Sequence, residues 1–166
     1  LKNEWQRPWV PFTSRFKVLL RLENSIELIR KKFSRNWKRS LKKSSKFKLK
    51  IVPIRNHEII SKLYKEMKLN KGLRQKDIYS EYECKSIFFA FKKKLLILGA
   101  KDELNNICSI RGAIIRNGVF HDIFAASNNF GRLSSASHLI LDALIEKAIS
   151  KGYLAVSYTH LRAHET

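Results

Sequence analysis

The sequence predicts a mixed α/β (α+β) domain in which a central, mostly antiparallel sheet is flanked by helices. Three strand-like runs follow one another between residues 93 and 127, and helical repeats precede and follow them. The second and third runs are joined by Asn117-Gly118, a strong hairpin signal because both residues tolerate positive φ. The 166 residues, 44% of them hydrophobic, suffice for one folded domain with a real core.

The first third of the chain predicts a strand, one long helix and a second strand. The run 16–23 is apolar and rich in β-type residues. Asn24 is placed to cap the helix, with Glu27 three residues later. The helix is expected to reach about Ser45, since apolar residues recur every three or four positions, and residues 47–54 alternate as in a strand. The helical stripe consists of Ile26, Ile29, Phe33, Trp37 and Leu41.

The remaining elements follow from the same periodicities and from turn residues. The predicted helices are 56–71, 76–91 and 134–152, and the predicted strands are 93–100, 107–116, 119–127 and 153–155. Gly72 and Gly152 are typical helix ends. The residues expected to face inward on the last helix are Leu139, Ile140, Ala143, Leu144 and Ala148.

The charge is the most unusual feature of the composition. The chain has 34 Lys and Arg against 14 Asp and Glu, which gives a net charge of +20 and a pI of about 10.2. Such a chain is expected to bind anions: nucleic acid, a membrane surface or phosphate-bearing small molecules. The segment Arg30–Lys50 holds eleven Lys or Arg and no acid. The ordinary alternative for such a segment is a solvated helix face.

Other features narrow the class of protein. Cys84 and Cys108 form no CxxC pair, which predicts buried free thiols in a reducing compartment and no metal site. No apolar run approaches the ~20 residues of a membrane span and no signal peptide is visible, so we expect a cytoplasmic location. The chain does not begin with Met, so we expect a further segment before Leu1.

The last residues, 156–166, resemble translated sequencing-adapter read-through. They follow Ala155, where a buried strand is expected to continue. We therefore interpret them as a non-native tail without an evolved fit to the sheet, although its β-rich start can extend a strand. No catalytic or metal role is assigned to His160 or His164.

The order of elements from residue 47, β-α-α-β-β-β-α-β, resembles the GNAT acyltransferase fold. In that fold the strand before the last helix diverges from its neighbour, and the following loop receives the donor's phosphates at a helix N-terminus. The corresponding loop here is 128–137. It lacks the Gly-rich spacing of coenzyme A loops, and its serines can cap the helix themselves, so we expect weak or no coenzyme A binding. A plain Ser-capped helix is the alternative. The implied donor-binding residues are Asn129, Gly131, Arg132, Ser134, Ser135 and Ser137.

A second resemblance covers more of the chain. The stretch NWKRSLKKSSKFKLKI, residues 36–51, is similar to the signature of the FemABX-like family of peptidoglycan aminoacyltransferases and their BioF2-like GNAT acetyltransferase relatives. LILDALIEKAISKGYLA, residues 139–155, resembles that family's helix before its last strand. The resemblance implies that residues 1–46 end a first GNAT-like subdomain and add a basic connecting helix, that 47–155 form an incomplete second subdomain, and that 156–166 are the tail.

The FemABX-like resemblance also implies partners and chemistry. Bacterial members transfer an aminoacyl or acyl group to an amine of a cell-wall precursor, and no cofactor is needed beyond the donor, aminoacyl-tRNA or acyl-coenzyme A. Further expected partners are the nucleotide- or lipid-linked precursor and the inner membrane surface, and the fragment alone is expected to be inactive. Charge-assisted hydrogen bonds suit the precursor's diphosphate. The implied substrate-binding residues are Lys38, Arg39, Lys42 and Lys43.

The sequence does not identify a catalytic base. His121-Asp122 lies within a predicted strand and is interpreted as packed or at a rim. Tyr79 and Tyr82 are interpreted as core or rim residues, and Arg111 as a salt-bridged structural residue.

Two other functions are open. One is a coenzyme A-dependent GNAT N-acetyltransferase. The other is a non-enzymatic, basic nucleic-acid-binding module, which explains the charge but shows no helix-turn-helix, RNP or zinc motif.

Overall fold

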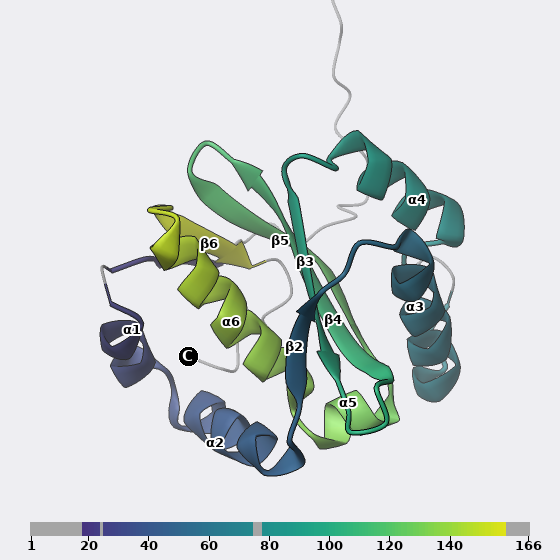
Figure 1. Ribbon diagram of the computed structural model, residues 1–166, viewed down its shortest axis with the longest axis horizontal. Helices are drawn as coiled ribbons and strands as arrows, with labels where there is room; N and C mark the ends of the chain where they lie inside the picture. The colour runs from purple at the N-terminus through teal and green to yellow at the C-terminus, as the bar shows by residue number, and fades with distance from the viewer. Residues whose placement is uncertain (1–17, 24, 75–77, 159–166) are drawn as a thin grey trace, which may run out of the picture.

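A six-stranded sheet with helices on both faces organises the protein (Figure 1). The computed structural model describes residues 18–23, 25–74 and 78–158. The strand order is β1-β6-β5-β4-β3-β2, and every neighbouring pair is antiparallel except β5 and β6. This confirms the predicted fold class. The strands are β1 Val18–Arg21, β2 Lys50–Pro53, β3 Leu95–Lys101, β4 Ile107–Arg116, β5 Val119–Ser127 and β6 Ala155–Tyr158.

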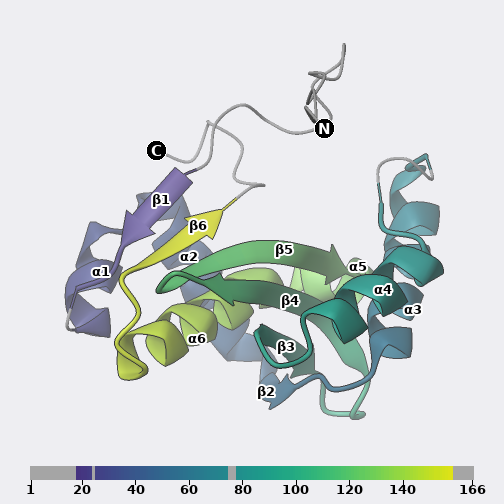
Figure 2. The same cartoon turned by 90° about the horizontal axis from the view of Figure 1, so that it is seen from above.

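The helices form two layers. α1, α2 and α6 lie on one side of the sheet, and α3 and α4 lie on the other (Figures 1 and 2). A short 3₁₀ turn, η1 (Ser45–Phe47), links α2 to β2. The helices are α1 Ile26–Lys32, α2 Arg35–Ser44, α3 His57–Lys71, α4 Glu81–Ala90, α5 Asn129–Leu133 and α6 Ala136–Ser150.

The prediction of one helix up to Ser45 is wrong, because the chain breaks between α1 and α2. Phe33 is extended, with ψ at 143°, and the Ser34 side chain accepts a hydrogen bond from the Trp37 N–H and caps α2. Ser25 caps α1 in the same way; Asn24, the predicted cap, lies outside the described residues. Periodicity did not reveal the break, since Phe33 still packs on Trp37 with ring centroids 4.7 Å apart.

The turn residues act where the sequence placed them. Asn117 and Gly118 have φ angles of 50° and 72°, and the strands they join match their predicted bounds. Asn56 caps α3, and Gly72 ends that helix in the left-handed region. Ser80 and Glu83 form a capping box, which starts α4 five residues after the predicted start of that helix.

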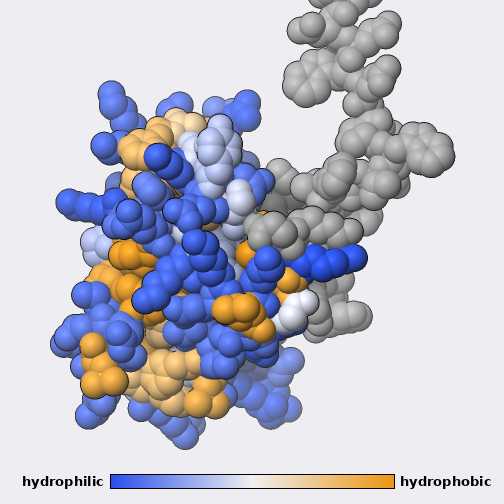
Figure 3. All heavy atoms as spheres, turned by 90° about the vertical axis from the view of Figure 1, so that its right-hand side faces the viewer, coloured by the Kyte–Doolittle hydropathy of each residue, from blue (hydrophilic) through white to orange (hydrophobic). Residues whose placement is uncertain are grey.

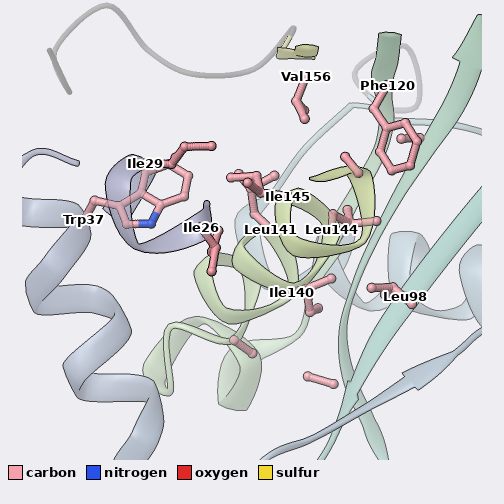
Figure 4. Close-up of a cluster of buried hydrophobic side chains, with 14 of the residues drawn as sticks. Ile26, Ile29, Trp37, Leu98, Phe120, Ile140, Leu141, Leu144, Ile145 and Val156 are labelled. Atoms are coloured by element: carbon pink, nitrogen blue, oxygen red, sulfur yellow. The ribbon is translucent and has the colours of Figure 1, made fainter. Parts of the chain in front are cut away.

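The core on the α6 side joins sequence-distant elements (Figure 4). Of the residues predicted to face inward on α6, Ile140, Leu144 and Ala148 are buried, whereas Leu139 and Ala143 are half-buried. Leu141 and Ile145, which the prediction omitted, are buried as well, because α1 and α2 cover a second stripe of this helix.

The start of the adapter-like segment takes part in the sheet. β6 extends from Ala155 to Tyr158, so the strand predicted at 153–155 begins only at its last residue. Val156 and Ser157 are buried between β1 and β5. Residues 159–166 lie outside the described part of the chain.

Gly131 fixes the position of α5, and its replacement tests this packing. A Cβ there would lie 2.1 Å from the Cys108 carbonyl oxygen, whereas Gly72 has no atom within 4 Å. Gly131→Ala should lower the free energy of unfolding by about 3 kcal/mol, because backbone must move. Gly72→Ala, the control, should cost about 1 kcal/mol through its positive φ. Urea denaturation measures both; equal losses would contradict the close approach.

Candidate functional site

The strands β5 and β6 diverge and leave a notch in the sheet. Among the described residues, which end at Tyr158, they pair over Val119–His121 and Ala155–Ser157, and the second half of β5 has no β6 partner there. The loop 128–137 and the start of α6 follow directly at this open end (Figure 2). This is the divergence that the GNAT resemblance implied for the strand before the last helix.

A pocket of about 280 Å³ occupies this region, and we call it the notch pocket. It brings together α3, β4, β5 and the loop after β5. Three of its residues, Lys71, Arg111 and Arg132, are basic, and no acidic residue lines it within the described part of the chain. The pocket is therefore suited to an anion. Its lining residues are Met67, Lys71, Arg111, Ala125, Ser127, Arg132 and Ser137.

Arg111 and Asp122 form a buried ion pair behind the notch pocket. The exposed fraction is 8% for Arg111 and 1% for Asp122. Arg111 donates from Nε and Nη2 to the two Asp122 carboxylate oxygens, and from Nη1 to Ser137 Oγ at 3.3 Å. This confirms the interpretation of Arg111 as a salt-bridged residue. The pair ties β4 and β5 to the first turn of α6, and Arg111 still reaches the pocket.

A β-bulge follows Asp122 in β5. The register between β4 and β5 shifts by one residue, since Gly112 pairs with Phe124 whereas Ala113 pairs with Asp122. Such an extra residue reverses the alternation of side chains. Phe120 accordingly packs in the core on the α6 side, and Phe124 packs in the core under α3 and α4.

The loop 128–137 is more than a Ser-capped start of α6, because it contains a short helix of its own. Asn128 accepts a hydrogen bond from the Gly131 N–H at 2.9 Å and caps α5, a short helix that the sequence did not predict. Of the six implied donor-binding residues, Arg132 and Ser137 line the notch pocket. The other four are Asn129, Gly131, Ser134 and Ser135; Gly131 and Ser134 are buried.

The prediction that serine side chains cap α6 is wrong. Ser134 Oγ donates to the Phe130 and Gly131 carbonyls, and Ser137 Oγ accepts from Arg111. Ser135 stands at the N-cap with φ of 54° and makes no side-chain cap hydrogen bond. The first N–H groups of a helix have no acceptor inside it. In α6 the His138 N–H donates to the Ser135 carbonyl at 3.1 Å, so the Ala136 and Ser137 N–H groups are the ones placed to bind an anion beside Arg111 and Arg132.

Tyr64 organises the open edge of β5. Its hydroxyl oxygen accepts a hydrogen bond from the Ala125 N–H at 3.0 Å, and burial raises the pKa of this tyrosine far above its ordinary value. Burial also raises the pKa of Tyr79, whose ring lies against Tyr64 and Phe124. Both phenols therefore stay protonated and structural. Tyr82 is exposed, and His121 is half-buried on β5 outside the pocket lining.

The basic helix α2 carries a second, shallower groove. Arg35, Lys38, Arg39 and Lys42 line this groove, which has a volume of about 470 Å³, and Lys43 is exposed outside it. Trp37 packs edge-on against His138, with ring centroids 5.2 Å apart. This contact holds α2 beside the N-terminal turn of α6.

The two cysteines are buried free thiols, as predicted. Cys108 donates to the Ala100 carbonyl, and burial raises the pKa of its thiol to about 11. No group of three or more His, Cys, Asp or Glu suited to a metal occurs within residues 18–23, 25–74 and 78–158. In the same ranges, no helix combines the length and hydrophobicity of a membrane span.

Comparison with solved structures supports a FemX-like, GNAT-type fold. The structure of FemX matches with a TM-score of 0.75 at 10% identity, covering 93% of this chain and 55% of FemX. The chain thus spans little more than half of FemX. The Escherichia coli ribosomal-protein-S18-alanine N-acetyltransferase matches with a TM-score of 0.55 at 10% identity, covering 71% of this chain and 70% of that one.

A third match holds a ligand. An aminoglycoside 6′-N-acetyltransferase complexed with coenzyme A matches with a TM-score of 0.51 at 12% identity, covering 66% of this chain and 60% of that one. No protein-family model and no curated protein matches the sequence. At these identities the likeness establishes the fold, and the fold predicted from the order of elements is confirmed.

The buried ion pair gives a test of the site's architecture. Asp122→Ala leaves the Arg111 guanidinium buried without its carboxylate, so the free energy of unfolding should fall by about 3–5 kcal/mol. Glu81→Ala, which removes the exposed Lys65–Glu81 pair, should cost far less. Urea denaturation provides both values. Similar losses for the two variants would show that the Arg111–Asp122 pair does not stabilise the junction.

Proposed function

We propose that this chain carries the acyl-donor site of an N-acyltransferase that transfers an aminoacyl or acyl group to an amine of a cell-wall (peptidoglycan) precursor. The notch pocket is the observation that carries the proposal, because it joins an uncapped helix N-terminus to Arg111 and Arg132. The names of the structural neighbours, FemX and two N-acetyltransferases, support it.

The pocket would hold the donor by its phosphates. Two guanidinium groups and the first N–H groups of α6 suit a phosphate through charge-assisted hydrogen bonds. The Ala125 N–H points away from β4 toward Tyr64, so the Ser127 N–H two residues later points to the same open edge. That N–H can donate to the donor's carbonyl oxygen, where negative charge develops during acyl transfer. The protein's role is thus to position the reactants and to stabilise charge.

The groove on α2 would bind the acceptor. Its four basic side chains suit the diphosphate of a nucleotide- or lipid-linked precursor, and the connection of Trp37 to His138 keeps the groove next to α6. Both forms of the precursor would be met in the cytoplasm or at the inner membrane surface of a bacterium. We also propose the two-subdomain organisation that the FemABX-like resemblance implies.

The acyl donor is either aminoacyl-tRNA or acyl-coenzyme A, used as a co-substrate. The net charge of +20 favours a polyanion such as tRNA. The open first turn of α6 favours a second candidate function, a coenzyme A-dependent N-acetyltransferase, because the capping that argued against a pyrophosphate is not there. A non-enzymatic nucleic-acid-binding module accounts for the charge alone and leaves the notch pocket without a role.

Donor binding tests the notch pocket. Arg132→Ala should weaken acyl-donor binding by roughly tenfold or more, as expected for one lost charged hydrogen bond. Arg116→Ala is the control, since Arg116 is exposed at the opposite end of β4. Calorimetry with acetyl-coenzyme A and a salt titration with aminoacyl-tRNA measure the two donors. Identical donor binding by the two variants would contradict the proposal; a steep salt dependence would identify the polyanion.

Two adjacent lysines test the acceptor groove. Lys42 lines the groove on α2, whereas Lys43 is exposed outside it. Lys42→Ala should weaken binding of the diphosphate-bearing precursor by roughly tenfold, and Lys43→Ala should leave it nearly unchanged. Equilibrium binding to the nucleotide-linked precursor distinguishes the two. Small, equal effects would mean that α2 presents an ordinary solvated face.

A further inference from the structure

A second pocket lies on another side of α5, and we call it the aromatic pocket. It has a volume of about 640 Å³ and is formed by η1, the turn between β3 and β4, and Phe130. Figure 1 shows α5 at the end of the sheet where α2 leads into β2. Phe130 and Arg132 are two positions apart on α5, so they point to different sides of this helix. The aromatic pocket and the notch pocket are thus neighbours with separate linings.

The walls of the aromatic pocket are two phenyl rings that do not belong to the core. Phe47 and Phe130 meet edge to face, with ring centroids 5.9 Å apart and planes at 86°. Phe130 is 38% exposed, and neither ring packs into the two buried clusters. A partly exposed ring face in a concave site is a stacking platform for a flat heterocycle.

The rim of the aromatic pocket offers groups of both charges. Lys46 and Lys48 stand on either side of Phe47, and Asp102 and Glu103 face them from the β3–β4 turn. The Asn106 N–H donates to Asp102 Oδ1 at 2.8 Å, which fixes this carboxylate and leaves Oδ2 as an acceptor. Lys48 pairs with Glu103 at 2.9 Å. Lys46 is therefore the cation left for a phosphate, and Asp102 is the acceptor left for an amino group.

We propose that the aromatic pocket binds a nucleotide whose base carries an exocyclic amino group. The base stacks on Phe130, the amino group donates to Asp102, and the phosphate lies at Lys46. The inference does not require the proposed acyl transfer. Where the proposed acyl transfer holds, the inference names the part of the acyl donor that this pocket would bind, since coenzyme A and the 3′ end of tRNA both contain adenosine.

The pattern of charge favours a nucleotide over a lipid surface. Exposed hydrophobic residues ringed by lysines can also dock on anionic membranes. Asp102 and Glu103 would repel such a surface. The two phenyl rings line the hollow, and Leu104, which is 81% exposed at the rim, stands directly beside these two carboxylates. On the neighbouring face, which carries α3 and α4, hydrophobic residues are separated by hydrophilic ones (Figure 3).

The test compares adenosine 5′-monophosphate with uridine 5′-monophosphate, whose base has no exocyclic amino group. Calorimetry should show the adenine nucleotide binding more tightly to the protein, and Asp102→Ala should remove that preference. Phe130→Ala should weaken binding of the adenine nucleotide by about tenfold, the effect of losing one stacked ring. Leu133→Ala is the control, because Leu133 is an exposed residue of the same helix outside the pocket. Folding of each variant is checked by thermal denaturation.

Two further ligands distinguish coenzyme A from tRNA as the source of the nucleotide, and further measurements test the competing explanations. Adenosine 3′,5′-bisphosphate represents coenzyme A and the trinucleotide CCA represents tRNA; the tighter binder identifies the source. Arg132→Ala should reduce acyl-donor binding without changing binding of adenosine 5′-monophosphate, so the two proposals fail separately. No binding at millimolar nucleotide, equal losses in Phe130→Ala and Leu133→Ala, or Phe130-dependent binding to phosphatidylglycerol vesicles in place of nucleotide would overturn the inference.

Discussion

The hydrogen-bonded group of Arg111, Asp122 and Ser137 is the interaction on which the candidate site depends. It joins the two central strands to the first turn of α6, and its ion pair is almost wholly removed from solvent. Asp122 lies two residues after Phe120, on the side of the sheet where α6 lies, and the bulge in β5 sends the next residues, from Phe124 on, to the opposite alternation. Forming a buried charge pair adds little net stability, because both charges lose their hydration. Removing one partner is strongly destabilising, because the other charge is then buried and unpaired. The site is therefore set by polar contacts as much as by hydrophobic packing.

Local signals in the sequence predicted most of the fold, and they failed where geometry is set by tertiary contacts. Asn117-Gly118, Asn56 and Gly72 define a hairpin and a helix by their own backbone preferences. The break between α1 and α2 was missed because the apolar stripe continues across it. The short helix α5 was missed because its position depends on Gly131 fitting against the Cys108 carbonyl, which no local pattern reveals.

The candidate site was only partly visible in the sequence. The loop 128–137 was identified through the order of elements, and two of its six implied residues line the notch pocket. Met67 and Lys71 could not be found in this way, since they come from the far end of α3 and meet the loop only across the open edge of β5. The prediction that serines cap α6 was wrong because the Ser137 hydroxyl accepts from a guanidinium and the Ser134 hydroxyl donates to carbonyls, so neither binds the N–H groups of the helix N-terminus.

The pairing of β1 with β6 has a consequence for the order of folding. Val18 lies opposite Tyr158, so almost the whole described chain separates the two partners, and among the described strands β1 lies at the sheet edge and pairs with β6 alone. Closing so long a loop carries a large entropic cost, which neither strand offsets before the sheet and α6 exist. The hairpin of β4 and β5 has the opposite character, because a two-residue turn brings its strands together. The N-terminal strand should accordingly join the sheet last and leave it first.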